Sequence, residues 1–251
     1  MVSGKPVEKD SMKITAPWHS PAISDENLQR LDRLANLGTL SAGIAHEIKN
    51  ALVPIGTFVE LMVQKSDDQE LAASVERELK RIDSLIIQML QFACPRPVTF
   101  APVQVHEVLD LSLRLLQHQI AGKKISVTRS YQAAPGTVPG DEAQLQQVVM
   151  NLLLNALEAM EFNGALAIST EVDKKNSHQP SLKIIIQDNG AGIARENLDR
   201  VFEPFFTTKK NGTGLGLAIS QRVAWEHHGK IEAQSEIGKG SIFTVSLPAG
   251  K

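Results

Sequence analysis

Hydrophobic residues recur every three or four positions along the first third of the chain. The set is Leu28, Leu31, Leu34, Leu37, Leu40, Ile44, Ile48, Leu52, Ile55, Val59 and Met62. This spacing predicts a long helix, from about residue 24 to residue 65, whose apolar stripe forms a coiled-coil or helical-bundle seam. His46 lies two residues from both Ile44 and Ile48, so it projects away from the stripe, with Glu47 beside it and Asn50 one turn further on.

A second helical pattern follows a short polar turn after residue 65. Its apolar positions are Leu71, Val75, Leu79, Ile82, Leu85, Ile86, Met89 and Leu90. A two-helix hairpin cannot enclose its own seam, whereas two copies form a four-helix bundle, so we expect a homodimer. The predicted organisation is a flexible leader at 1–23, this hairpin at 24–94, a proline-containing linker at 95–101 and a second domain at 102–251.

The second domain mixes helical and strand patterns without regular alternation. Strands are predicted near Val103 and at 124–131, 166–172, 182–188, 230–235 and 241–247; helices are predicted at 105–121, 141–160, 195–198 and 215–228. The order favours an α+β sandwich, with a mixed sheet and helices on one face, over a doubly wound nucleotide-binding fold. The predicted fold class of the chain is therefore α+β, with an N-terminal two-helix hairpin followed by an α/β sandwich domain that has a mixed sheet.

The amino-acid composition limits where in the cell the protein is expected and which partners it is expected to bind. The 251 residues are 42% hydrophobic and 22% charged with a net charge of −2, which gives no electrostatic reason to expect nucleic acid as the main partner. The single cysteine, Cys94, cannot form an intrachain disulfide, and no apolar run approaches the length of a membrane span. We therefore expect a cytoplasmic protein without a membrane span.

Two glycine clusters mark a candidate phosphate-binding region. They are Asp188-Asn-Gly-Ala-Gly192 and Asn211-Gly-Thr-Gly-Leu-Gly216, and neither has the P-loop pattern. The second cluster opens a predicted helix, whose first backbone N–H groups suit anions. Asn151 and Asn155 share one face of the preceding helix and could ligate a magnesium ion held mainly by phosphate oxygens.

Five motifs occur in an order that resembles the catalytic core of the two-component sensor histidine kinases. They are Ala45-His-Glu-Ile-Lys-Asn50, Asn151-Leu-Leu-Leu-Asn155, Asp188-Asn-Gly-Ala-Gly192, Phe202-Glu-Pro-Phe-Phe206 and Gly212-Thr-Gly-Leu-Gly216. Each motif alone is modest evidence, but the ordered set covers residues 25–248. Within this family, the segments Ile-Lys-Asn and Phe-Phe-Thr-Thr-Lys are most similar to those of the nitrogen-regulatory branch.

The resemblance implies an ATP-dependent autophosphorylating protein-histidine kinase. His46 would accept the γ-phosphoryl group and pass it to an aspartate of a response regulator receiver domain. Glu47 would act as general base, and Asn50 would position water for hydrolysis of the regulator's phosphoaspartate. The signal would come from an upstream sensor protein or from a part of a longer chain.

The resemblance also implies the ATP site. Asp188 would accept a hydrogen bond from the adenine amino group, and Asn155, joined by Asn151, would hold Mg²⁺ and phosphate. The residues expected to approach the nucleotide in the glycine loops are Gly190, Gly192, Gly212, Thr213, Gly214, Leu215 and Gly216. A lid at about 201–213 would be anchored by Phe202, Phe205 and Phe206, and Lys209 would neutralise phosphate charge.

Departures from the family pattern leave alternatives open. Ala51 stands where many members have proline, Glu158 where many carry a phosphate-binding lysine, and Thr207 where some lids place an arginine. One alternative is thus a catalytically degenerate ATP-binding adaptor or a phosphatase-only partner of a response regulator. A second is a water-using ATPase of the gyrase and heat-shock chaperone type, but Asn151 occupies the position of that class's catalytic glutamate.

Overall fold

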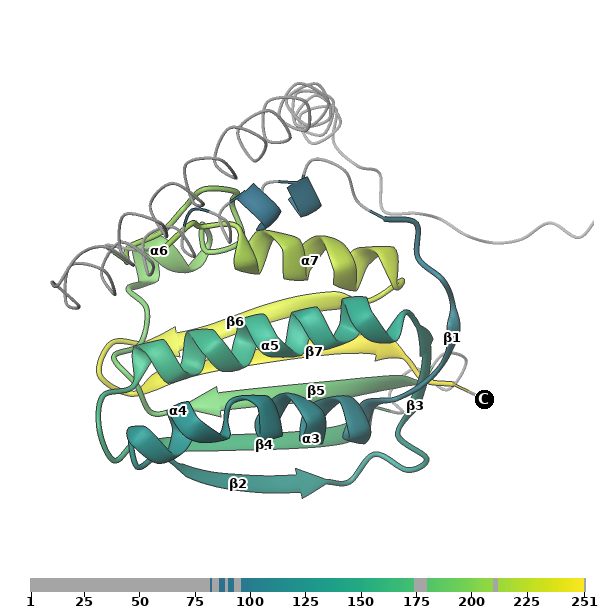
Figure 1. Cartoon of the computed structure of the whole chain (residues 1–251), viewed down its shortest axis with the longest axis horizontal. Coiled ribbons are helices and arrows are strands. Elements are labelled where there is room, and N and C mark those ends of the chain that lie inside the picture. Colours follow the sequence, from purple (N-terminus) through teal and green to yellow (C-terminus); the bar gives the residue numbers. More distant parts are fainter. Residues whose placement is uncertain are drawn as a thin grey trace, which may run out of the picture.

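The computed structural model describes residues 82, 86–88, 90–92, 96–173, 180–209 and 212–250. The predictions for the leader, for the long helix that carries His46, Glu47 and Asn50, and for Cys94 lie outside these residues. The described elements run in the order shown in Figure 1. They are β1 (Ala101–Gln104), α3 (Val105–Leu115), α4 (Gln117–Gly122), β2 (Ser126–Tyr131), β3 (Thr137–Gly140), α5 (Glu142–Ala159), β4 (Ala165–Asp173), β5 (Ser181–Asp188), α6 (Arg195–Leu198), α7 (Gly216–Glu226), β6 (Lys230–Glu236) and β7 (Gly240–Pro248).

A five-stranded sheet forms one layer, in the order β2-β4-β5-β7-β6. β2 runs parallel to β4, and the remaining pairs are antiparallel. β1 and β3 form a separate antiparallel pair. The predicted mixed sheet is therefore confirmed.

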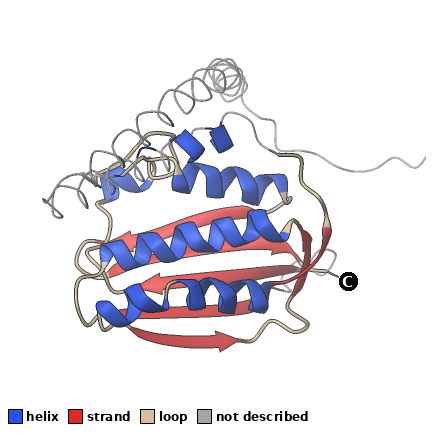
Figure 2. Cartoon of the chain, viewed as in Figure 1, coloured by secondary structure: helices blue, strands red, loops and turns tan. Residues whose placement is uncertain are grey.

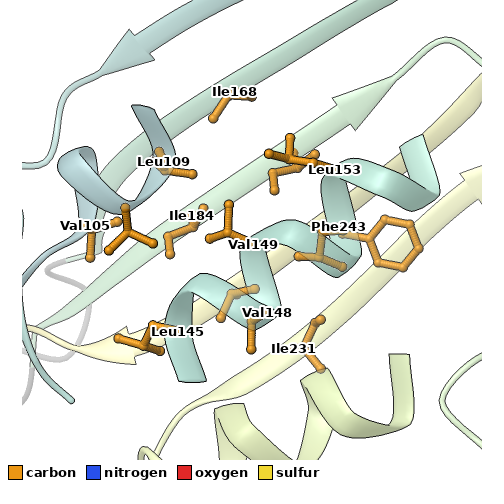
Figure 3. Close-up of a cluster of buried hydrophobic side chains, with 14 of the residues drawn as sticks. Val105, Leu109, Leu145, Val148, Val149, Leu153, Ile168, Ile184, Ile231 and Phe243 are labelled. Carbon is orange, nitrogen blue, oxygen red and sulfur yellow. The ribbon is translucent and has the colours of Figure 1, made fainter. Parts of the chain in front are cut away.

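The helices α3, α5 and α7 cover one face of the sheet (Figure 2). The strands alternate between buried and more exposed positions, as in β5, where every second residue faces the core. α5 lies at the centre of this layer and buries Leu145, Val148, Val149, Leu152, Leu153, Ala156 and Leu157. Figure 3 shows four of them, Leu145, Val148, Val149 and Leu153, beside Ile184 and Phe243 from the sheet. This packing confirms the predicted two-layer α+β sandwich.

The start of α5 follows from its sequence. Asp141 has an extended backbone, and its carboxylate accepts a hydrogen bond from the Gln144 N–H. Such a cap satisfies one of the backbone donors that the first turn of a helix leaves unpaired. The helix predicted at 141–160 therefore begins and ends within one residue of the expected positions.

Two local predictions were wrong. The helix predicted at 105–121 is divided at the buried Leu116, which leaves helical geometry (φ −95°, ψ 3°). The strand β3 was not predicted, because Pro135, Gly136, Pro139 and Gly140 read as a turn. A short two-stranded pair tolerates proline because few ladder bonds depend on it.

None of the helices in the described ranges combines the length and the apolar content that crossing a membrane would require.

His227 ties the C-terminal end of α7 to the start of α5. Its side chain is 1% exposed, and Nε2 accepts a hydrogen bond of 2.9 Å from the Asp141 N–H. Nδ1 lies 2.8 Å from the Val223 carbonyl oxygen and, since Nε2 is the acceptor, must carry the proton. The sequence analysis assigned no chemistry to this histidine, and its contacts are structural.

We expect His227→Ala to lower the free energy of unfolding by about 2–4 kcal/mol, because it leaves a cavity and an unpaired buried N–H. Urea denaturation followed by circular dichroism would measure the change. His118→Ala, on an exposed position of α4, is the matched control and should stay within about 0.5 kcal/mol of the unchanged chain. Equal stability of the two variants would contradict the structural role of His227.

Candidate functional site

A cavity of about 950 Å³ opens at the C-terminal end of α5. α5 forms one side, the segment after β5 forms another, and residues 201–209 and 212–214 with the start of α7 close the rest. The sequence-predicted residues that line it are Asn151, Asn155, Asp188, Gly190, Gly192, Lys209, Gly212, Thr213, Gly214 and Gly216. Leu215 is buried behind this wall, 2% exposed. The fold therefore brings together residues that are up to 65 positions apart in the sequence.

Asp188 ends β5 at the floor of the cavity and is 3% exposed. Burial raises the pKa of its carboxyl, while hydrogen bonds from the backbone of Gly190 and Ser241 and the charge of Lys209 act in the opposite direction. The Gly190 N–H donates to Oδ1 at 2.8 Å. A buried carboxyl held in this way is a specific acceptor for a polar hydrogen of a ligand.

Two glycines of the predicted loops are required by backbone geometry. Gly192 has φ +71°, and a Cβ there would lie 2.1 Å from the Glu236 carbonyl oxygen. Gly214 has φ +69°, and a Cβ there would lie 2.4 Å from the carbonyl carbon of Phe205. Both positions exclude other residues by conformation and by space, so the glycines shape the cavity wall as well as admitting a ligand.

Asn151 joins α5 to the start of α7. Its Nδ2 donates to the Gly216 carbonyl oxygen at 3.1 Å and to Ser220 Oγ at 3.3 Å. The amide nitrogen is thus used to position the glycine loop. Ser220, four residues after Gly216, was not predicted as part of the site, although its helical spacing places it below the loop.

Asn155, one turn further along α5, faces the lid segment (residues 201–213). Lys209 Nζ donates to Asn155 Oδ1 at 2.9 Å and lies 2.5 Å from Glu158 Oε2. Lys209 thus lies on the cavity wall beside Asn155, and its role in neutralising phosphate charge stays a prediction. Glu158 was noted in the sequence only as a departure from the family pattern, and a contact across 51 residues has no signal in local spacing.

The three lid phenylalanines have different surroundings. Phe202 packs against the core, and the Arg200 guanidinium lies 4.2 Å above the ring of Phe206. Phe205 is 59% exposed and has φ +64°. Its ring meets that of Phe92, the last described residue of the predicted hairpin, edge-on at 6.2 Å.

Two further side chains, Thr213 and Arg222, bind the described end of the hairpin. Thr213 Oγ1 donates to Gln88 Oε1 at 2.7 Å and also accepts a hydrogen bond from the Leu215 N–H. Arg222 of α7 donates to the carbonyl oxygens of Gln91 and Phe92, at 2.7 Å each. Burial lowers the pKa of Arg222, and its guanidinium satisfies carbonyls that a helix end leaves free.

The residues that line the cavity fit a nucleoside triphosphate with a magnesium ion. No side chain caps the start of α7 in the described structure, so its first N–H groups can receive phosphate oxygens. The described residues hold no cluster of three or more His, Cys, Asp or Glu that could bind a metal alone. Magnesium usually keeps few protein ligands and takes phosphate oxygens, which fits the single amide oxygen offered by Asn155.

Comparison with known proteins identifies two domain families in the chain. The family described as "Histidine kinase-, DNA gyrase B-, and HSP90-like ATPase" matches residues 140–251. The "His Kinase A (phospho-acceptor) domain" matches residues 36–97. The second match includes His46, Glu47 and Asn50, which lie outside the described residues.

Individual relatives carry the same assignment. Sporulation kinase C of Bacillus subtilis (strain 168) is 36% identical over 228 residues, which are 90% of this chain and 52% of the relative. The chain thus spans about half the length of the curated relatives it matches.

Two solved structures extend the comparison. The catalytic domain of histidine kinase ThkA is 30% identical, with a TM-score of 0.54 over 60% of this chain and 95% of that domain. Histidine kinase ThkA in complex with response regulator protein TrrA is 28% identical, with a TM-score of 0.65 over 90% of this chain and 66% of that one. On these matches, the chain belongs to the family of two-component sensor histidine kinases and contains their phospho-acceptor and ATPase-type domains.

Proposed function

We propose that the chain is an ATP-dependent protein-histidine kinase that phosphorylates His46 and passes the phosphoryl group to an aspartate of a response regulator. The observation that carries the proposal is the cavity that joins the buried Asp188, Asn155 and the glycine loops, in a chain that also has the phospho-acceptor domain. On this proposal, Asp188 would accept a hydrogen bond from the base, Asn155 would ligate the metal, and backbone N–H groups of the glycine loops would bind phosphate.

ATP would lie with its base against Asp188 and its phosphates toward the start of α7. The carboxylate of Asp188 accepts a hydrogen bond from the adenine amino group, whereas guanine offers a carbonyl oxygen at that position. Asn155 would hold Mg²⁺, which neutralises phosphate charge, and Lys209 would add a second cation from the lid segment. Gly190, Gly192, Gly212 and Gly214 allow the backbone to approach the nucleotide closely.

In the transfer step, an unprotonated ring nitrogen of His46 attacks the γ-phosphorus. The bond between that phosphorus and the β–γ bridging oxygen breaks, leaving a phosphohistidine and ADP. Glu47 would orient the imidazole and accept its ring proton, so the nitrogen opposite the attacking one becomes neutral. Catalysis would consist mainly of positioning and of charge stabilisation.

A response regulator receiver domain is the proposed acceptor. The ThkA structure in complex with response regulator TrrA supports a partner of this class. A homodimer, built by pairing two hairpins, is the proposed assembly because a single hairpin leaves its seam exposed. Asn50 would allow the same helix face to hydrolyse the regulator's phosphoaspartate by positioning a water molecule.

Labelling with γ-³²P-ATP and Mg²⁺ tests the proposal directly. We expect the intact chain to acquire label that is lost in acid and retained in base, because a phosphoramidate bond is acid-labile. His46→Gln should lose at least about 100-fold of the label, since the phosphoryl acceptor is absent. The control His118→Gln should be labelled normally.

Absence of label on the intact chain, with ATP still bound, would contradict the kinase and favour the adaptor or phosphatase alternative. Incubation of the chain with a phosphorylated receiver domain would then separate these two, since only a phosphatase releases inorganic phosphate.

Asp188→Asn should weaken ATP binding about 10- to 100-fold. Asparagine has one acceptor oxygen, which the Gly190 N–H uses, and its NH₂ group would face the adenine amino group donor to donor. The affinity of the unchanged chain should also fall on acidification through the raised pKa of Asp188, because protonation turns one carboxyl oxygen into a donor while the Gly190 N–H uses the other. Isothermal titration calorimetry at several pH values measures both effects.

The same substitution should stabilise the nucleotide-free protein at neutral pH. A carboxyl whose pKa is raised by folding costs stability once the pH exceeds its unfolded-state pKa. The unfolding temperature of Asp188→Asn should therefore rise, while that of the exposed-site control Asp199→Asn should not change. A lower unfolding temperature together with unchanged ATP affinity would contradict the assigned role.

A further inference from the structure

The ammonium of Lys209 contacts two polar side chains of the cavity wall. It donates to Asn155 Oδ1 and pairs with the carboxylate of Glu158, one turn further along α5. The lid backbone holds the lysine in place, because its N–H donates to Thr207 Oγ1 at 3.1 Å and its carbonyl oxygen accepts from the Gly212 N–H at 3.2 Å. The lid therefore delivers one cation to the wall that carries the proposed metal ligand.

The ammonium and a magnesium ion cannot both stay on the same oxygen. Asn155 Oδ1 is the atom that would face Mg²⁺, and a cation already bound to it repels a second one at close range. Loading of the metal with its nucleotide therefore requires Lys209 to leave Asn155. Two acceptors then compete for the lysine, namely the Glu158 carboxylate and the phosphate oxygens.

Glu158 is placed to decide that competition. Its side chain is 57% exposed and that of Lys209 is 40% exposed, so the pair is weak enough to exchange partners. An exposed ion pair of this kind corresponds to roughly a 1.5- to 5-fold change in an equilibrium constant. That range is small against the strength of nucleotide binding but large enough to measure.

We propose that Glu158 is a positioning residue. It competes with the nucleotide phosphates for Lys209 and so lowers the affinity of the cavity for the nucleotide. In the nucleotide-free state Glu158 holds Lys209 over Asn155. When the nucleotide enters with its metal, Lys209 exchanges the carboxylate for a phosphate oxygen, and the lid segment moves with it. The inference rests on the proposed function only in requiring that the cavity bind ATP.

A double-mutant cycle between Glu158 and Lys209 tests the competition. The measured quantity is the dissociation constant of a non-hydrolysable ATP analogue, determined by calorimetry in EDTA and again in excess Mg²⁺. In EDTA we expect Glu158→Gln to bind the analogue about two- to fivefold more tightly than the unchanged chain, because Lys209 is released toward the phosphates. In Mg²⁺ the gain should be smaller, since the metal already neutralises phosphate charge.

Measuring Glu158→Gln in the Lys209→Met background shows whether Glu158 acts through Lys209 or only by repelling the phosphates with its own charge. Removal of any carboxylate near the phosphates reduces repulsion, and Glu161→Gln measures that effect, since Glu161 lines the same cavity and forms no ion pair with Lys209 in the described part of the chain. If Glu158 acts through Lys209, Glu158→Gln in the Lys209→Met background should match Glu161→Gln.

Three results would overturn the proposal. They are an equal gain from Glu158→Gln in both backgrounds, weaker binding by Glu158→Gln, and no change at all. Unfolding temperatures within about 1 °C of one another would show that the variants fold alike. Since the readout is binding rather than phosphorylation of His46, a kinase-inactive chain could still support the competition, and a labelled chain could still contradict it.

Discussion

The candidate site depends on the joint between α5 and α7. Neither helix contains the whole site, because the asparagines lie on α5 and the proposed phosphate-binding turn lies at the start of α7. Two hydrogen-bonded contacts fix them to each other. Asn151 donates to Gly216 and Ser220, and the Asp141 N–H donates to His227 Nε2. They act at opposite ends of α7, so they fix its direction as well as its distance from α5. The hydrophobic contacts between the helices supply most of the burial, but such contacts alone do not define one rotation or register.

Burial of Asp188 at the floor of the cavity costs folding free energy, and hydrogen bonds from the surrounding backbone reduce that cost. A buried aspartate is unfavourable in its charged form, and Asp188 sits between β4 and β7 in the interior of the sheet. Backbone N–H groups of Gly190 and Ser241 return part of the lost hydration. Gly240 next to it has φ +95° and no room for a side chain. The structure around this carboxyl is therefore less stable than an apolar, regular strand end would be. Such local loss of stability is expected at functional sites.

The sequence was informative wherever the signal is local. The cap Asp141, the buried stripe of α5 and the alternation of β5 each depend on spacing within one element, and the predicted boundaries lie close to the observed ones. The break at Leu116 was not visible, since the apolar spacing continues through it. Strand β3 was missed because its proline and glycine content signals a turn, and only pairing with β1 makes it a strand. Asn155, Asp188 and the glycine loops could be placed in one site through the family pattern, but the contact of Lys209 with Glu158 depends on how the lid folds back over α5.

The candidate cavity and the residues that lead into the domain lie toward opposite ends of the sandwich. Residues 96–100 lead into β1 beside β3, and the C-terminal residues end near the same place (Figure 1), where the Gly250 N–H donates to the Thr137 carbonyl oxygen. Asn155, the proposed metal ligand, is 13 residues from the first residue of α5, which is about 20 Å along the helix. A rotation of 10° about the entry end would therefore move this part of the cavity by about 3–4 Å, on the scale of a bond-forming approach. Because the cavity lies away from the point where the chain enters the domain, a small rotation at that point becomes a larger displacement of the bound substrate.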